Sequence, residues 1–142
     1  MTKKFIILVG NVGTGKTTYC KEHFSEDFEI VRPDDWPLMS ELERHVKFNK
    51  RMMQLTGEGK NIVLDGVNPI AKERKKILRF ADERTYKKIA IDFGSGDEET
   101  LQRRIEASPQ IPKDQWRDWH NINKSDYQKP NSKEGFDEII TI

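Results

Sequence analysis

A glycine-rich loop between an apolar run and a helical stretch is the feature that most constrains the fold. Residues 5–9 read FIILV, and residues 10–17 follow directly as GNVGTGKT. A short all-apolar run of this kind is typical of a central parallel strand that is covered on both faces. The order strand, glycine loop, helix therefore predicts an α/β domain with the loop at the carboxyl end of its first strand.

The loop matches the P-loop pattern of glycine, four free residues, glycine, lysine, then serine or threonine. Its backbone N–H groups are free to point inward around phosphate oxygens, because the glycines place no Cβ in the way. We expect Lys16 to bridge the β and γ phosphates, the Thr17 hydroxyl to bind Mg²⁺, and Thr18 to lie near the α phosphate. The candidate nucleotide-binding residues are Gly10, Gly13, Thr14, Gly15, Lys16, Thr17 and Thr18.

Strands and helices alternate along the rest of the chain. The expected strands are residues 5–9, 28–31, 61–64, 88–93 and 136–142, and the expected helices are residues 16–25, 37–56, 69–84 and 97–107, with a further short helix near Pro112. Asn68 followed by Pro69 predicts an N-cap, and Ser40 with Glu43 predicts a capping box.

This alternation predicts a P-loop NTPase-type three-layer sandwich: a parallel sheet of about five strands, with helices on both faces and a helical lid. We expect one domain over residues 1–142, with the lid at about residues 97–125. Ligands should lie at the carboxyl ends of the strands.

Composition restricts the class of protein only weakly. Lys and Arg total 25 against 24 Asp and Glu, so the net charge of +1 neither requires nor excludes a polyanionic partner. The single Cys20 excludes an intramolecular disulfide and fits a reducing compartment. Because no run approaches the roughly 20 apolar residues that cross a bilayer, we expect a cytoplasmic protein without a membrane partner. Nothing in the sequence indicates an oligomeric state.

Four segments together resemble the kinase domain of the polynucleotide 5′-kinase family, within the small P-loop kinases. They are residues 10–17, residues 32–35 (RPDD), residues 64–68 (LDGVN) and residues 129–140, so the similarity spans nearly the whole chain. The resemblance implies transfer of the γ-phosphoryl group of ATP or GTP, with Mg²⁺, to the 5′-hydroxyl end of a DNA or RNA strand.

The resemblance also implies a general base. In the family, an aspartate after the second strand takes the proton of the acceptor hydroxyl, and Asp34 or Asp35 occupies that place here. Chemistry gives an independent reason, because an attacking hydroxyl must lose its proton as it bonds to phosphorus. We favour Asp34; the alternative is that either aspartate only caps the next helix.

Other roles follow from position in the resemblance. Asp65, at the end of the third strand, is expected to hold a Mg²⁺-bound water or else to form the turn. Asn68 is expected to contact the acceptor or to cap its helix, and Trp36 to stack on an acceptor base or to pack under the lid. The same two alternatives hold for the two other tryptophans, Trp116 and Trp119.

Lid arginines neutralise charge on the transferred group in this family, and Arg103 and Arg104 are the candidates here. A second arginine one helical turn onward is missing, so Lys113 or Arg117 is expected to replace it. Pro37 stands where close family members often carry an arginine that contacts the nucleic-acid end. A kinase of a small acceptor, or a nucleotide-dependent binding module, therefore remains an alternative.

Overall fold

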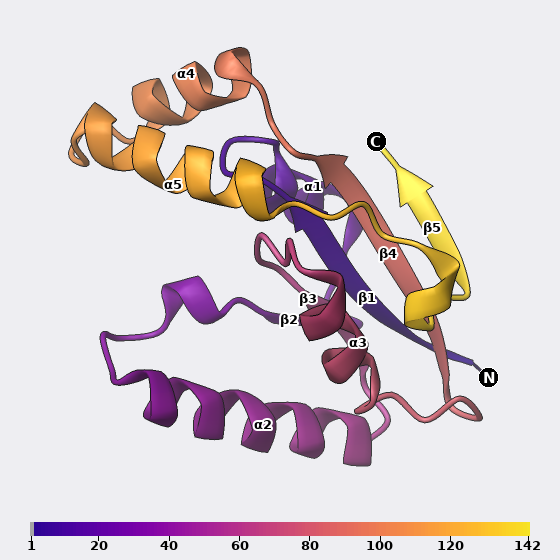
Figure 1. Cartoon of the computed structure of the whole chain (residues 1–142). Helices are drawn as coiled ribbons and strands as arrows, with labels where there is room; N and C mark the ends of the chain where they lie inside the picture. Colours follow the sequence, from indigo (N-terminus) through magenta and orange to yellow (C-terminus); the bar gives the residue numbers. More distant parts are fainter. Residues whose placement is uncertain (1) are drawn as a thin grey trace.

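The computed structural model describes residues 2–142, which form one parallel sheet with helices on both faces (Figure 1). The strands are β1 (Lys3–Gly10), β2 (Phe28–Val31), β3 (Asn61–Leu64), β4 (Tyr86–Gly94) and β5 (Glu138–Thr141). Their order in the sheet is β2-β3-β1-β4-β5, and every neighbouring pair is parallel. The prediction that the first strand is central is therefore confirmed.

Helices form the outer layers of the molecule. They are α1 (Lys16–His23), α2 (Glu41–Gly57), α3 (Ala71–Leu78), α4 (Glu98–Ala107) and α5 (Lys113–Asp126), with short 3₁₀ turns η1 (Pro33–Asp35) and η2 (Ser132–Glu134). One face of the sheet packs against α1, and the opposite face packs against α2 and α3. Helices α4 and α5 lie beyond the carboxyl ends of β1 and β4, in the segment expected to form a lid (Figure 1).

The strand before the glycine loop, β1, is buried on both faces. Phe5, Ile7 and Val9 face the α2 and α3 layer, whereas Ile6 and Leu8 face α1, and none of these side chains is more than 3% exposed. Alternate side chains of a strand point to opposite faces, so a strand covered on both sides needs an all-apolar sequence. The glycine loop therefore follows directly from a strand that is buried on both faces.

The segment after β3 differs from the prediction. Helix α3 begins at Ala71 with Ile70 as its N-cap residue, so the prediction that Asn68 caps the helix is wrong. Asn68 instead adopts a left-handed backbone conformation with φ 46°. Its side-chain amide donates a hydrogen bond to the Leu8 carbonyl at 2.8 Å, and the Gln128 side chain accepts from the Ala71 N–H at 2.8 Å. The helix end is therefore satisfied by a residue distant in the sequence.

Two other helices also test the predictions. Ser40 accepts a hydrogen bond from the Glu43 N–H at 3.1 Å, which confirms the predicted cap of α2. Helix α5 starts next to Pro112 as expected, but with 14 residues it is longer than the short helix predicted.

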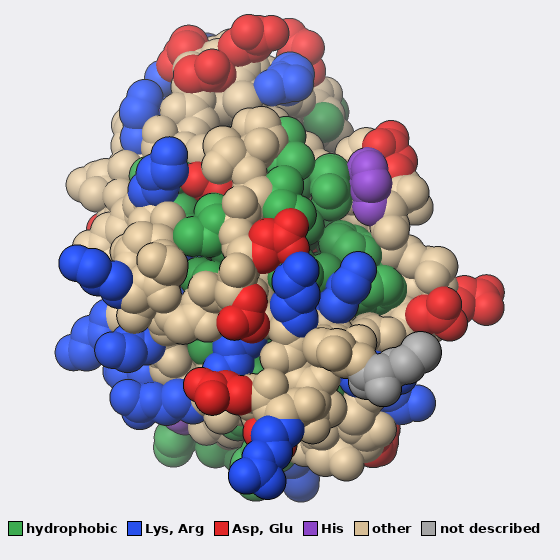
Figure 2. Space-filling model, turned by 90° about the vertical axis from the view of Figure 1, so that its right-hand side faces the viewer, with side chains coloured by type: hydrophobic (Ala, Val, Ile, Leu, Met, Phe, Trp, Pro, Cys, Tyr) green, Lys and Arg blue, Asp and Glu red, His purple; other side chains and the backbone are tan. Residues whose placement is uncertain are grey.

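Strand β5 forms one edge of the sheet. Figure 2 faces this side and shows hydrophobic side chains in its middle, with charged side chains around them. On this edge Lys87 and Glu138 form an ion pair at 2.8 Å, and charged side chains at a sheet edge disfavour pairing with another chain. Over residues 2–142, no helix combines the length and the apolar composition needed to cross a membrane.

Candidate functional site

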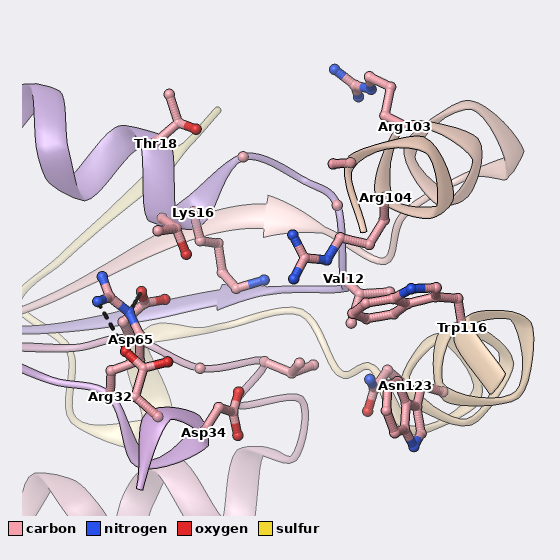
Figure 3. Close-up of a pocket in the computed structure, with 18 residues that line it drawn as sticks. Val12, Lys16, Thr18, Arg32, Asp34, Asp65, Arg103, Arg104, Trp116 and Asn123 are labelled. Atoms are coloured by element: carbon pink, nitrogen blue, oxygen red, sulfur yellow. Dashed lines mark hydrogen bonds and ion pairs between the residues drawn. The ribbon is translucent and has the colours of Figure 1, made fainter. Parts of the chain in front are cut away.

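A cavity of about 930 Å³ lies among the glycine loop, η1, the end of β3 and the two lid helices (Figure 3). It brings together residues that are far apart in the sequence. The predicted site residues that line it are Gly13, Gly15, Lys16, Thr17, Thr18, Asp34, Asp35, Asp65, Arg103 and Arg104. The cavity thus lies at the carboxyl ends of the strands, where parallel α/β sheets bind ligands.

The start of α1 is arranged to bind an anion. Gly15 is the N-cap residue of the helix, and among residues 2–142 no side chain forms a hydrogen bond that caps it. The first N–H groups of a helix have no partner within the helix and carry partial positive charge. Gly13 and Gly15 have φ values of 76° and 94°, a region that favours glycine and that lets successive N–H groups converge. A helix start of this kind can bind an anion such as a phosphate group.

Lys16 projects into the same place. Its ammonium donates hydrogen bonds to the carbonyl oxygens of Gly10 at 2.6 Å and Asn11 at 2.8 Å. Burial lowers the pKa of Lys16 to about 8, although the nearby Asp65 and Asp34 carboxylates act in the opposite direction. The charged form of a buried lysine is stabilised when a negative charge is placed beside it, and a phosphate group would supply such a charge.

Gly10 and Thr14 make contacts that shape the glycine loop. A Cβ on Gly10 would lie 2.6 Å from the Cβ of Phe93, so glycine is needed for the close approach of β4. The Thr14 hydroxyl donates to the Asn11 carbonyl at 2.7 Å. In the described part of the chain these two residues do not line the cavity, and their contacts indicate a role in the shape of the loop.

Arg32 organises the carboxylates beside Lys16, a role that its place in the RPDD segment did not predict. Its Nε donates to the buried Asp65 carboxylate at 2.7 Å, and its Nη1 lies 3.4 Å from the Asp35 carboxylate. The sequence does not indicate that Arg32 pairs with Asp65, because the two residues are 33 positions apart. Arg32 thus fixes the position of the Asp65 carboxylate at the end of β3.

Asp34 and Asp35 both lie on η1 and line the cavity, but their surroundings differ. Asp35 forms the ion pair with Arg32, and its side chain is 68% exposed. Asp34 is directed to the cavity in Figure 3, and its charge acts on the pKa of Lys16. Of the two carboxylates, Asp34 is thus the one electrostatically coupled to the glycine loop.

The lid supplies one well-placed cation. Arg104 extends toward Lys16 in Figure 3, and its guanidinium lies 4.6 Å from the centre of the Trp116 ring. Arg103 lines the cavity but its guanidinium points away from Lys16 (Figure 3). Arg117 pairs with Glu98 at 2.7 Å, and among the described residues neither Arg117 nor Lys113 lines the cavity. The expectation that one of these two replaces a missing arginine therefore has no geometric support.

Asn11 ties the glycine loop to the lid. The side chain is 1% exposed, and its amide donates to the carbonyl oxygens of Ser95 at 2.8 Å and His120 at 2.9 Å. Gly13 in turn packs against the Thr100 carbonyl, so a Cβ there would collide with α4. Asn11 occupies a free position of the P-loop pattern, and no rule of sequence could have singled it out.

The two residues expected to contact an acceptor lie elsewhere. Trp36 packs against the core on the α2 and α3 face, with the Lys47 ammonium 4.6 Å from its ring centre. Asn68 bonds to the end of β1 through its side chain. Within residues 2–142, neither lines the cavity, whereas Trp116, Trp119 and Asn123 of α5 do.

No protein-family model matches the sequence, and no curated protein matches it. Solved structures do resemble the fold. The crystal structure of a fungal RNA kinase matches with a TM-score of 0.69 and 20% identity, covering 100% of this chain and 38% of that one. The chain thus spans well under half of that kinase.

Two further structures match over most of both chains. Kti12 from Chaetomium thermophilum, in complex with ADP-AlF3, gives a TM-score of 0.63 at 18% identity and covers 96% of this chain and 87% of that one. A gluconokinase from Sinorhizobium meliloti 1021 gives 0.59 at 12% identity, with 96% and 80% covered. The predicted α/β fold, a five-stranded parallel sheet with helices on both faces, is therefore confirmed, and these three structures share it.

Proposed function

We propose that the chain transfers the γ-phosphoryl group of ATP or GTP to the 5′-hydroxyl end of a DNA or RNA strand. The observation that carries the proposal is that a phosphate-binding loop with Lys16 and the Asp34 carboxylate line one cavity. The likeness to a fungal RNA kinase supports the acceptor class. The likeness to Kti12 bound to ADP-AlF3 supports a nucleotide as donor.

On the donor side, the Lys16 ammonium and the N–H groups at the start of α1 hold the β and γ phosphates. The Thr17 hydroxyl and, through water, the Asp65 carboxylate, which both line the cavity, would hold Mg²⁺. A hydroxyl and one carboxylate suit this ion, which usually binds through few protein ligands together with substrate phosphates. When bound, Mg²⁺ neutralises charge on the phosphate oxygens.

On the acceptor side, Asp34 takes the proton of the 5′-hydroxyl. A bond forms between that oxygen and the γ phosphorus, while the bond from the γ phosphorus to the bridging oxygen breaks. The nucleoside diphosphate leaves with the electron pair of the broken bond. Arg104 reaches toward Lys16 from the lid and stabilises charge on the phosphoryl group in transit.

A label-transfer experiment tests this function. The protein is incubated with Mg²⁺, γ-labelled ATP or GTP, and a single-stranded oligonucleotide that ends in either a 5′-hydroxyl or a 5′-phosphate. We expect label only on the 5′-hydroxyl strand, and none with Lys16→Ala. If the wild-type protein binds nucleotide but labels neither strand, the proposed acceptor is wrong.

A kinase of a small acceptor is the second candidate. Pro37 is exposed at the place where the resemblance leads us to expect an arginine for the nucleic-acid end, and a gluconokinase shares the fold. The measurement is release of the nucleoside diphosphate in the presence of nucleosides, nucleotides or sugars. Stimulation by one of these, without labelling of any oligonucleotide, would favour this candidate.

A further inference from the structure

Helix α5 presents one face to the cavity, and this face carries Trp116, Trp119 and Asn123. Spacings of three and four residues place side chains on the same side of a helix. Trp116 is 5% exposed and lies under the Arg104 guanidinium, so its ring is already covered. Trp119 meets Trp116 edge to face, with ring centres 5.1 Å apart, and is still 40% exposed.

An indole fixed by a neighbour yet open to a cavity is suited to stacking. The contact with Trp116 limits the orientations of the Trp119 ring, so little conformational freedom remains to be lost on binding. Every nucleobase has a flat aromatic face that can lie on such a ring. Asn123, one turn onward, adds an amide with two donors and an acceptor that can pair with a base edge.

The position of the α5 face in the cavity favours contact with the acceptor rather than with the nucleotide donor. In Figure 3, Asn123 lies on the side of the cavity that holds Asp34, whereas Thr18 and Arg103 lie on the opposite side of Lys16. The transferred phosphoryl group sits at Lys16 in the proposed function. A ligand on the α5 face is therefore on the same side as the proposed general base.

We propose that Trp119 stacks on the base of the 5′-terminal nucleotide of a single-stranded acceptor, and that Asn123 hydrogen-bonds to the edge of this base. The proposal rests on the proposed function, and it narrows the substrate to strands whose terminal base is unpaired. A base within a duplex already stacks on its neighbour and pairs through its edge, so it cannot reach the indole without being displaced.

The test compares two 5′-hydroxyl oligonucleotides that differ only in the terminal nucleotide, which carries a base in one and is abasic in the other. Stacking of one base contributes about 1 to 3 kcal/mol, so kcat/KM of the wild type should be roughly fivefold to a hundredfold lower for the abasic strand. Trp119→Ala should phosphorylate the strand with the base more slowly and lose most of the difference between the two strands, because only the hydrogen bond of Asn123 to the base would remain. Trp119→Phe keeps an aromatic face and should still favour the strand with the base.

Ile122→Ala is the matched control, because Ile122 is an exposed apolar residue of α5 that does not line the cavity in the described part of the chain. Ile122→Ala should keep the wild-type difference between the strands.

If the wild type phosphorylates both strands equally well, the stacking proposal is wrong, but the proposed kinase function is supported. If the wild type phosphorylates neither strand, the proposed function is wrong. Equilibrium binding of the same two strands then tests whether Trp119 stacks on the terminal base. Tighter binding of the strand with the base, lost in Trp119→Ala, would support stacking on Trp119. Equal binding of the two strands by the wild type would overturn it.

Discussion

Asp34 and Asp35 are neighbours in the sequence but not equivalent in the site. Arg32 lies between Asp35 and Asp65 and pairs with both carboxylates. Asp34 lines the same cavity without an ion pair among the described residues, and a carboxylate placed there can accept a proton from a substrate hydroxyl. The sequence left either aspartate open as the base, because the choice depends on which one the arginine holds.

Arg74 is the residue whose loss should most affect stability. It is 0% exposed, and it donates to the Glu134 carboxylate at 2.7 Å and to the carbonyl oxygens of Asn68 and Gln128 at 2.9 and 2.8 Å. Removing one partner of a buried pair leaves a charge unpaired. Arg74→Met should therefore lower the free energy of unfolding, measured in urea, by about 3 to 5 kcal/mol.

Lys75→Met provides the control for this substitution. Lys75 is an exposed neighbour on α3, and its change should alter the free energy of unfolding by less than about 0.5 kcal/mol. A loss of under about 1 kcal/mol in Arg74→Met would contradict the view that this arginine fastens the loop after β3 to the segment before β5.

At the scale of elements, the contact between the glycine loop and α4 sets the position of the lid. Gly13 and Gly15 share positive φ values, so alanine is strained at both. At Gly13 the new Cβ would also meet the Thr100 carbonyl and the side chain of Arg104, whereas at Gly15 no described atom lies within 4 Å of it. Gly13→Ala should therefore lose clearly more stability in urea than Gly15→Ala, which should lose about 1 kcal/mol. Equal losses would show that α4 does not rest on the loop.

The packing of α5 should depend on pH through His120. The ring is 3% exposed, and within residues 2–142 its Nδ1 has no hydrogen-bond partner. Burial lowers the pKa of His120 below its ordinary 6.5; the cations Lys124 and Arg117 add to this effect, and Glu98 and Asp97 oppose it. The unfolded chain thus takes up a proton near pH 6.5 while the folded chain does not, so stability falls as the pH drops below 6.5.

Thermal unfolding between pH 7.5 and 5.5 measures this effect. We expect the midpoint temperature of the wild type to fall over this interval, and that of His120→Gln to fall less. Parallel curves for the two proteins would mean that His120 does not contribute to the pH dependence.

For the whole molecule, the sequence was most informative where local pattern and burial agree. Residues 5–9 and the glycine loop predicted the central strand and the start of α1 at the end of the loop, because both depend on neighbours in the chain. The backbone of Asn68 could not be predicted, since its partner is the Leu8 carbonyl 60 residues away. Trp119 was predicted either to stack on a base or to pack, and Asn123 was not predicted at all, because the positions of both depend on how α5 folds back over the sheet.

The central claim is that one cavity holds both the phosphate loop and the general base. The most direct measurement is the single-turnover rate of phosphoryl transfer from Mg²⁺-ATP to a 5′-hydroxyl oligonucleotide in the wild type, Asp34→Asn and Asp35→Asn, with nucleotide affinity determined for each. Removal of a general base costs about 10² to 10⁴ in rate. We expect a loss of this size in Asp34→Asn with nucleotide affinity unchanged, and a nearly wild-type rate in Asp35→Asn. A full rate in Asp34→Asn would contradict the account.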